Sequence, residues 1–352
     1  MFNLLCKRNN VKVSNFAIND LNNSVFISSN NNVIKIDDKD CNKQDVFLLN
    51  SIIEFILKGN IWIANLENFD TTIYNIKLEP LNTVNYIAAF SKDIKYFSTQ
   101  DYIYPTLYFN ESFDYPILGK VSKLEFNVIE TYNLDLGLNG VFLVINDDSF
   151  ISKNNEKIVL SNFKNEIIWQ QSFSDLLPSQ ETEEISISQE IIEISNIIYF
   201  TLNTNNQNIC FGLDAQTGKV VKQFPNILGD LIQENEYIYF LYYNSITRLN
   251  TTNDTIEKWD IQDLLDKEDI GYLYFPRWAV LDGQIYFSQT KGSDIHSGKI
   301  GARFGVLDFN KRELIFKDQL DPKYGTIGSI KMSKERLYLH TQDSTLHVFE
   351  KE

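Results

Sequence analysis

The sequence of 352 residues has little alanine, cysteine or histidine. It contains 7 Ala against 42 Ile and 47 aromatic residues. Because alanine is the best helix former while Ile, Tyr and Phe favour strands, this composition disfavours helical bundles, solenoids and doubly wound α/β folds. The three cysteines, Cys6, Cys41 and Cys210, are far apart and odd in number, which excludes a disulfide framework and a CxxC metal knuckle.

Long apolar runs are also missing. The first residues, MFNLLCKRNNVKVSN, carry a basic pair only after a short apolar stretch, and no run long enough for a secretory signal follows. Residues 191–202 are interrupted by Glu193 and Asn196 and fall short of the roughly 20 residues that a membrane-spanning helix needs. We therefore expect a soluble, cytoplasmic protein. A lipidated Cys6 is the less favoured alternative, because no small residue precedes it.

Basic residues are scarce relative to acidic ones. The chain has 32 Lys and Arg against 47 Asp and Glu, and its net charge of −15 disfavours nucleic acid and anionic membranes and favours a basic protein partner. Residues 1–240 hold 17 basic and 30 acidic groups, a net charge of −13, whereas residues 241–352 hold 15 and 17, a net charge of −2. This uneven charge predicts steering of a basic partner; the alternative is that it serves solubility alone.

What the sequence does contain is a repeat. A short apolar strand centred on an aromatic residue, followed by a polar turn, recurs on average about every 45 residues, a spacing typical of one four-stranded propeller blade. The eight central aromatic residues are Phe26, Trp62, Tyr96, Phe142, Tyr199, Tyr239, Tyr286 and Tyr338.

A second pattern has a fixed spacing. A strand ends in Leu, a polar turn follows, and the next strand has its first apolar residue seven positions after that Leu. We expect the Asp or Asn in the turn to bond the turn backbone, and Gly218 or Asn253 to take the left-handed conformation. The four pairs are Leu160 and Ile167, Leu213 and Val220, Leu249 and Ile256, and Leu307 and Leu314. The aromatic residues that follow, which we expect to fill gaps between neighbouring blades, are Trp169, Trp259 and Phe316.

The segment LDAQTGKVVKQF resembles the repeat of quinoprotein-like (PQQ-type) β-propellers. Leu213, Asp214, Thr217 and Gly218 match the strand end and Thr-Gly turn of that repeat, while Lys222 stands where the repeat has Trp. The resemblance implies the propeller fold. Quinoprotein dehydrogenases of this family are exported, longer, calcium-dependent and often marked by adjacent cysteines, none of which is visible in this chain, and Asp214 and Thr217 also fit a purely structural turn.

These patterns predict an all-β chain in which residues 1–352 form a single β-propeller domain. We expect seven four-stranded blades, with six or eight as alternatives, because the interval from Trp62 to Tyr96 is short and the stretch after it is irregular. The last repeat has room for three strands only, so the N-terminal strand is expected to close the last blade.

Groups for catalysis are few. His340 and His347 lie on adjacent predicted strands and can face each other across a hairpin, but no third metal ligand lies at a usual spacing. No GxSxG, HExxH, P-loop or EF-hand motif occurs. The sequence therefore predicts no catalytic residues, no cofactor, no metal site and no enzyme activity.

Two irregular stretches are candidates for partner binding, since propeller loops carry binding residues. The first spans residues 101–116; its aromatic residues suit a protein interface, or alternatively fill a blade core. They are Tyr102, Tyr104, Tyr108, Phe109, Phe113 and Tyr115. The second is a basic insertion at residues 290–303, with His296, Lys299 and Arg303.

Together these features favour a non-catalytic propeller that binds a basic protein. A specific form is an immunity or antitoxin-type protein that neutralises a basic toxin such as a nuclease. The alternatives are a divergent quinoprotein-type or sugar-acting propeller enzyme, or a sensor that holds a small ligand in the central channel. A nucleic-acid or membrane partner is not expected.

Overall fold

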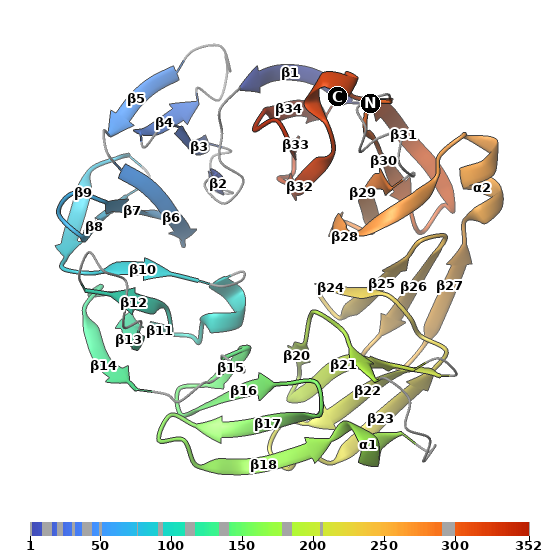
Figure 1. The fold of residues 1–352 in the computed structure, drawn as a ribbon, viewed down its shortest axis with the longest axis horizontal. Coiled ribbons are helices and arrows are strands. Elements are labelled where there is room, and N and C mark those ends of the chain that lie inside the picture. Colours follow the sequence, from blue (N-terminus) through green and yellow to red (C-terminus); the bar gives the residue numbers. More distant parts are fainter. Residues whose placement is uncertain are drawn as a thin grey trace. The chain divides into compact units, whose positions relative to one another are not determined.

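Strands make up most of the chain in the computed structural model (Figure 1). The structure describes residues 2–8, 16–19, 24–29, 32–36, 44–48, 51–75, 77–90, 94–109, 117–133, 141–177, 185–204, 207–290 and 300–351. Within these ranges, no helix is long and apolar enough to cross a membrane. The short helices are η1 (Ile94–Phe97), α1 (Phe173–Leu176), α2 (Gln262–Lys267) and η2 (Pro322–Tyr324).

The described strands form eight antiparallel sheets, which we number in chain order as blades 1 to 8. Blade 1 contains β2 (Phe16–Asn19), β3 (Ser24–Ser29), β4 (Asn32–Ile36) and β5 (Gln44–Leu48). Blade 2 contains β6 (Ser51–Leu57), β7 (Asn60–Asn65), β8 (Asp70–Tyr74) and β9 (Pro80–Val84). Blade 3 contains β10 (Ile87–Ala89), β11 (Tyr102–Ile103), β12 (Thr106–Tyr108), β13 (Ile117–Ser122) and β14 (Val128–Tyr132). Blade 4 contains β15 (Leu143–Asn146), β16 (Ser149–Lys153), β17 (Lys157–Asn162) and β18 (Ile167–Ser172).

The second half of the chain repeats the arrangement. Blade 5 contains β19 (Ser186–Ile187), β20 (Ile192–Ile194), β21 (Ile197–Asn203), β22 (Asn208–Asp214) and β23 (Val220–Pro225). Blade 6 contains β24 (Asp230–Glu234), β25 (Tyr237–Tyr242), β26 (Ser245–Asn250) and β27 (Ile256–Asp260). Blade 7 contains β28 (Tyr272–Leu281), β29 (Gln284–Thr290), β30 (Arg303–Asp308) and β31 (Glu313–Gln319). Blade 8 contains β32 (Ile327–Met332), β33 (Arg336–Thr341), β34 (Leu346–Lys351) and β1 (Phe2–Arg8).

The prediction of seven blades is therefore wrong by one, and eight, the alternative left open, is the number observed. The expected closing strand is confirmed. Strand β1 pairs antiparallel with β34, from Phe2 opposite Lys351 to Arg8 opposite Leu346 (Figure 1). Pairing the two ends of the chain in one sheet covers an edge that would otherwise be open.

Six of the eight predicted aromatic centres are buried on the strand that comes second in the pairing order of its sheet, namely β3, β7, β21, β25, β29 and β33. These residues are Phe26, Trp62, Tyr199, Tyr239, Tyr286 and Tyr338. The other two assignments are wrong. Tyr96 lies in the helix η1, and blade 3 uses Leu107 on β12 instead. Phe142 precedes β15, and Phe150 on β16 takes the buried place in blade 4, because both halves of this hairpin carry an aromatic residue and spacing alone does not choose between them.

The seven-residue spacing marks the hairpin between the third and fourth strands. Leu213 pairs with Val220, Leu249 with Ile256, and Leu307 with Leu314, while in blade 4 it is the neighbour of Leu160, Ser161, that pairs with Ile167. In each turn an Asx side chain accepts backbone hydrogen bonds, as expected: Asn162, Asp214, Asn250 and Asp308. The left-handed residues are Asn165, Gly218, Asp254 and Arg312, so Gly218 is confirmed and Asn253 is corrected to Asp254.

The predicted aromatic residues on the fourth strands do lie between neighbouring blades. Trp169 of blade 4 is almost completely buried, and its indole Nε1 donates to the carbonyl oxygen of Ala215, in the turn of blade 5, at 3.0 Å. Trp259 of blade 6 packs edge-on against Phe309 in the turn of blade 7. Phe316 of blade 7 packs against Phe2 of β1 in blade 8. Each fourth strand with such a residue is thus anchored to the next blade.

The chain divides into two compact units. The first comprises residues 1–67, 73–79 and 232–352, and the second comprises residues 68–72 and 80–231. The core of each unit consists of Ile, Leu and aromatic side chains packed between adjacent blades. That one domain spans residues 1–352 stays a prediction.

Candidate functional site

The two strand histidines do not form a site together. The register places His340 opposite Leu346 and His347 opposite Leu339, so the two imidazoles lie on opposite faces of blade 8. The alternative in which they face each other is wrong, because they are one position out of register across the hairpin. No group of three or more His, Cys, Asp or Glu side chains suited to a metal ion occurs among the residues that the structure describes.

Each histidine is instead part of the packing between blades. His340 is fully buried and stacks on Phe16 of blade 1, with ring centroids 6.3 Å apart. His347 is also fully buried; it meets Tyr324 edge-on at 4.6 Å, and its Nε2 lies 3.3 Å from Thr341 Oγ1. Burial lowers the pKa of His347 from 6.5 to about 4, so this imidazole is neutral at physiological pH.

The aromatic stretch at residues 101–116 is divided between core and surface. Tyr104 is fully buried, stacks on Phe163 with centroids 5.0 Å apart, and donates its hydroxyl to Asp147 Oδ1 at 3.1 Å. Burial and the nearby Asp147 carboxylate raise its pKa. Tyr104 therefore fills the core, as in the alternative interpretation.

The other aromatic residues of this stretch are more accessible. Tyr102 is half-buried with the Lys120 ammonium 4.4 Å from its ring centroid, and Tyr108 is half-buried on β12. Phe109 is exposed. The remaining two predicted residues, Phe113 and Tyr115, lie outside the described residues.

Of the three residues predicted in the basic insertion, Arg303 lies within the described residues. It begins β30, and its Nη2 lies 3.0 Å from Asp269 Oδ2 in an ion pair. His296 and Lys299 lie outside the described residues. Arg303 thus already has an acidic partner within the chain.

Four exposed apolar side chains lie on β9 and in blade 3. We call them together the blade-3 apolar patch; their exposed fractions are 47% for Leu81, 48% for Phe109, 84% for Leu124 and 49% for Ile129. Asn82 Nδ2 donates to Glu125 O at 3.3 Å, which brings β9 beside the turn between β13 and β14. The buried Tyr86 links Phe109 to this turn. Its ring centroid lies 6.2 Å from that of Phe109, and its hydroxyl donates to Phe126 O at 2.9 Å.

The turn that carries Leu124 is held rigidly. Ser122 Oγ accepts from the backbone N–H groups of Leu124 and Glu125, at 3.3 and 3.1 Å, and Ser122 O accepts from Phe126 N at 3.0 Å. Lys123 N donates to Asp101 O at 2.9 Å, which fixes the turn to the β11 side of the blade. The turn therefore presents a large apolar side chain to water from a backbone that is held on both sides.

The sequence interpretation found Phe109 but missed Leu81, Leu124 and Ile129. The only signal in the sequence is the apolar Leu124 between Lys123 and Glu125, within a segment that has no aromatic cluster around it. A single leucine in a polar turn is common on protein surfaces, so the pattern alone gives no reason to select it.

The blade-3 apolar patch belongs to the strongly acidic unit. The second unit, residues 68–72 and 80–231, contains 9 basic and 20 acidic residues, a net charge of −11. The first unit contains 23 basic and 27 acidic residues, a net charge of −4. Beside the patch, Glu125 and Glu130 are exposed. An apolar centre in an acidic field suits a protein partner that is basic around its own apolar contact.

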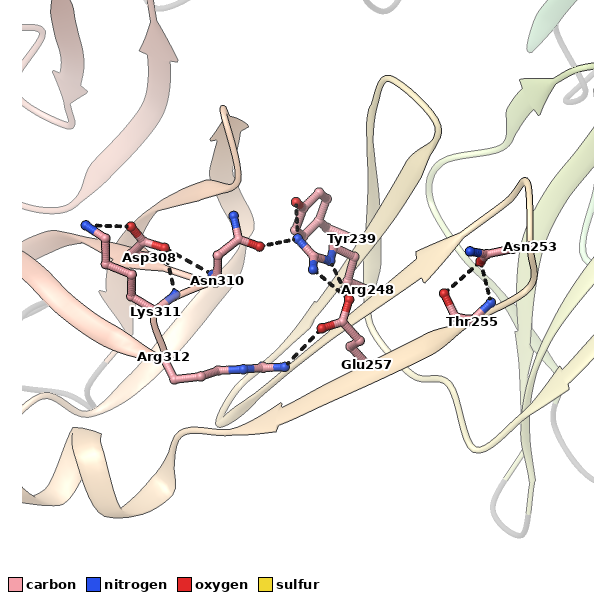
Figure 2. Close-up of polar contacts among 9 residues, drawn as sticks. All are labelled: Tyr239, Arg248, Asn253, Thr255, Glu257, Asp308, Asn310, Lys311 and Arg312. Atoms are coloured by element: carbon pink, nitrogen blue, oxygen red, sulfur yellow. Dashed lines mark hydrogen bonds and ion pairs between the residues drawn. The ribbon is translucent and has the colours of Figure 1, made fainter.

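A polar cluster joins blades 6 and 7 (Figure 2). The guanidinium of Arg248 on β26 donates to Glu257 Oε1 at 2.6 Å and to Asn310 Oδ1 at 2.7 Å, and lies 3.5 Å from the Tyr239 hydroxyl. Arg312 reaches the other oxygen of Glu257 at 3.6 Å.

Both guanidiniums of this cluster also lie against the Phe309 ring, at 4.6 Å for Arg248 and 4.0 Å for Arg312. Their charges are already paired with Glu257 and their faces are already packed on an aromatic ring. The cluster therefore serves to join two blades rather than to receive a ligand.

Comparisons with known proteins support the fold. No known protein family and no curated protein matches the sequence. Among solved structures, the chain is similar to BamB from Moraxella catarrhalis, with 9% identity, 100% of both chains covered and a TM-score of 0.52. It is also similar to the computationally designed Ika8 protein, with 10% identity, 97% and 98% coverage and a TM-score of 0.53, and to the Dos1 propeller, with 11% identity, 99% and 95% coverage and a TM-score of 0.53.

At these identities the similarity concerns the fold alone. The β-propeller prediction is confirmed. Membership of the quinoprotein-like superfamily stays a prediction.

Proposed function

We propose that this protein is a non-catalytic β-propeller that binds a basic protein partner through the blade-3 apolar patch. The observation that carries the proposal is Leu124, an apolar side chain 84% exposed on a turn whose backbone is hydrogen-bonded on both sides. The backbone of this turn loses little conformational entropy on binding, because it is already ordered by these hydrogen bonds in the free protein.

The charges around the patch support a basic partner. The unit that bears the patch has a net charge of −11, which attracts a basic protein over a distance of about one Debye length, roughly 8 Å, and raises the rate of encounter. The apolar centre then provides short-range affinity, as in interfaces where a few central residues dominate the binding energy.

The specific form that we propose is a cytoplasmic immunity or antitoxin-type protein that covers a basic toxin such as a nuclease. The strongly negative charge of one unit supports it, since nucleases carry basic surfaces that bind phosphate backbones. The propeller provides the rigid support for loops and turns that such a binding surface needs.

The experiment that tests the proposal is site-specific photo-crosslinking in the cells that make the protein. A photo-reactive amino acid replaces Leu124, and in a matched control it replaces Ile315, an apolar residue exposed on β31 in the first unit. We expect one dominant adduct at Leu124 with a protein of high isoelectric point and no such adduct at Ile315. When irradiation is repeated in a cell lysate, salt added beforehand should lower the yield of the adduct. Absence of an adduct at Leu124, or the same adducts at both positions, would contradict the proposal.

A further inference from the structure

The fourth strand of each blade pairs with the third strand and follows it in the chain, as β14 does in blade 3, except in the closing blade 8, where it is β1. These strands differ in how well their open edges are protected. Charged side chains and proline on an edge strand discourage pairing with other chains. Of the eight fourth strands that the structure describes, seven contain at least one such residue: Asp45 in β5, Pro80 in β9, Glu130 in β14, Lys222 in β23, Glu257 in β27, Glu313 in β31 and Lys7 in β1. The sequence of β18, IIWQQS, contains neither a charge nor a proline.

The open edge of β18 has a defined set of outward backbone groups. The N–H of Phe173 donates to Glu156 O, and the N–H of Asn162 donates to Glu166 O, which fixes the phase of the hydrogen bonds between β17 and β18. Because these bonds alternate along an antiparallel pair, the N–H and C=O groups of Gln170 and the N–H of Ser172 point away from β17, while the C=O of Ser172 belongs to the N-cap of α1. They form the row of donors and acceptors on which a further strand can pair.

The side chains at the start of β18 also favour the pairing of a further strand. Ile167 and Ile168 are 59% and 51% exposed, while the next residue, Trp169, is buried against blade 5 and holds the strand in place. A strand with β-branched residues, a fixed position and an unprotected edge is the type of surface to which an extended peptide adds.

We propose that β18 binds an extended, basic segment of a partner protein as an added fifth strand of blade 4. This inference rests on the proposed protein-binding function and names the mode of binding. Glu166 precedes the strand, and Glu156 and Asp175 lie exposed at its other end, while Lys157 already donates to Gln170 Oε1 at 3.0 Å. The net charge of −11 on this unit favours a basic segment and opposes pairing of β18 with a second copy of the chain.

The first test places the photo-reactive amino acid at Ile167 and compares its adducts with those formed at Leu124. The same basic partner at both positions is the expected result. A partner at Leu124 without one at Ile167 overturns strand addition and leaves the proposed function intact, whereas no adduct at either position overturns both. An Ile167 adduct with a second copy of the chain overturns the basic segment as occupant.

The second test removes the outward donor. In Gln170→Pro the ring replaces an N–H that β17 does not use, so the blade keeps its own hydrogen bonds while the added strand loses one. We expect the Ile167 adduct to fall at least about tenfold, with an unchanged melting temperature. Ile168→Lys, which restores a protective charge without altering the backbone, is expected to act in the same direction even if the proline variant unfolds.

The matched control is Lys258→Pro. Lys258 on β27 corresponds to Gln170 on β18, because its N–H also points away from the neighbouring strand. The hydrogen bonds from Ile261 N to Asn244 O and from Asn250 N to Thr255 O fix this alternation between β26 and β27. This variant should leave the Ile167 adduct unchanged. An equal loss in both proline variants, or no loss in Gln170→Pro and Ile168→Lys, contradicts strand addition at β18.

Discussion

Gly218 is the position at which the repeat is most sharply constrained. A Cβ atom placed there would lie 2.6 Å from Cδ2 of Trp169, which packs over the turn from the preceding blade. Its φ of 69° alone does not require glycine, because the equivalent residues Asn165, Asp254 and Arg312 have φ of 65°, 61° and 59° with side chains present. The ring of Trp169 is therefore what excludes a side chain at this position.

The magnitude follows from these contacts. Gly218→Ala should cost about 1 to 2 kcal/mol for the left-handed backbone and about 1 kcal/mol more for the Trp169–Ala215 hydrogen bond that a displaced indole loses. In a Trp169→Ala background only the backbone cost remains. We therefore expect a coupling free energy of about 1 kcal/mol or more between the two positions.

The assay is urea denaturation of the wild type, the two single variants and the double variant, followed by circular dichroism. Asp254→Ala is the matched control, since Asp254 holds the same left-handed place in its turn and already has a Cβ atom. It should cost less than about 1 kcal/mol. If Gly218→Ala lowers the free energy of unfolding by the same amount with and without Trp169, then the packing of the indole is not the reason that glycine is needed at this position.

Three further changes test individual buried groups. Because the pKa of His347 is about 4 in the folded chain and 6.5 when unfolded, stability should fall as the pH drops from 6.5 to 4, and His347→Gln should flatten this dependence in thermal melts. Burial raises the pKa of Glu54, which lies at a bulge in β6, from 4.5 to about 8; stability should fall as the pH rises through this range, and Glu54→Gln should melt higher than the wild type at pH 8. In the cluster of Figure 2, Arg248→Ala should cost about 2 kcal/mol in urea denaturation and Glu257→Ala less than about 1, because the carboxylate is half-exposed.

The elements that sequence reasoning predicted are those governed by local chemistry. The hairpin between Leu213 and Val220 follows from the Asp214 and Gly218 turn, whose hydrogen bonds form between residues close in the chain. The structure also explains why Lys222 stands where the repeat has tryptophan. Trp169 of blade 4 covers the Gly218 turn of the next blade, whereas the corresponding turn of blade 6, which follows the blade of Lys222, has Asp254 in place of glycine.

The elements that it missed depend on contacts between distant residues. Nothing local distinguishes Tyr96 in a short helix from an aromatic residue at the centre of a strand. With Tyr96 taken as a strand centre, the interval from Trp62 is too short for a blade, and the expected number of blades is therefore one too low. Tyr104 lies in the core because two residues of blade 4 contact it: Asp147 accepts its hydroxyl hydrogen bond, and Phe163 stacks on its ring. Leu124 becomes notable only when β9 and Tyr86 are seen beside its turn.

The proposed function depends most directly on the affinity of the purified protein for the partner captured at Leu124. Binding is measured by calorimetry for the wild type, Leu124→Asp and Ile315→Asp at low and at physiological salt. We expect Leu124→Asp to weaken binding at least about tenfold, Ile315→Asp to bind as the wild type does, and added salt to weaken all three. Equal affinities for the three chains, or affinities that do not change with salt, would contradict binding of a basic partner at the blade-3 apolar patch.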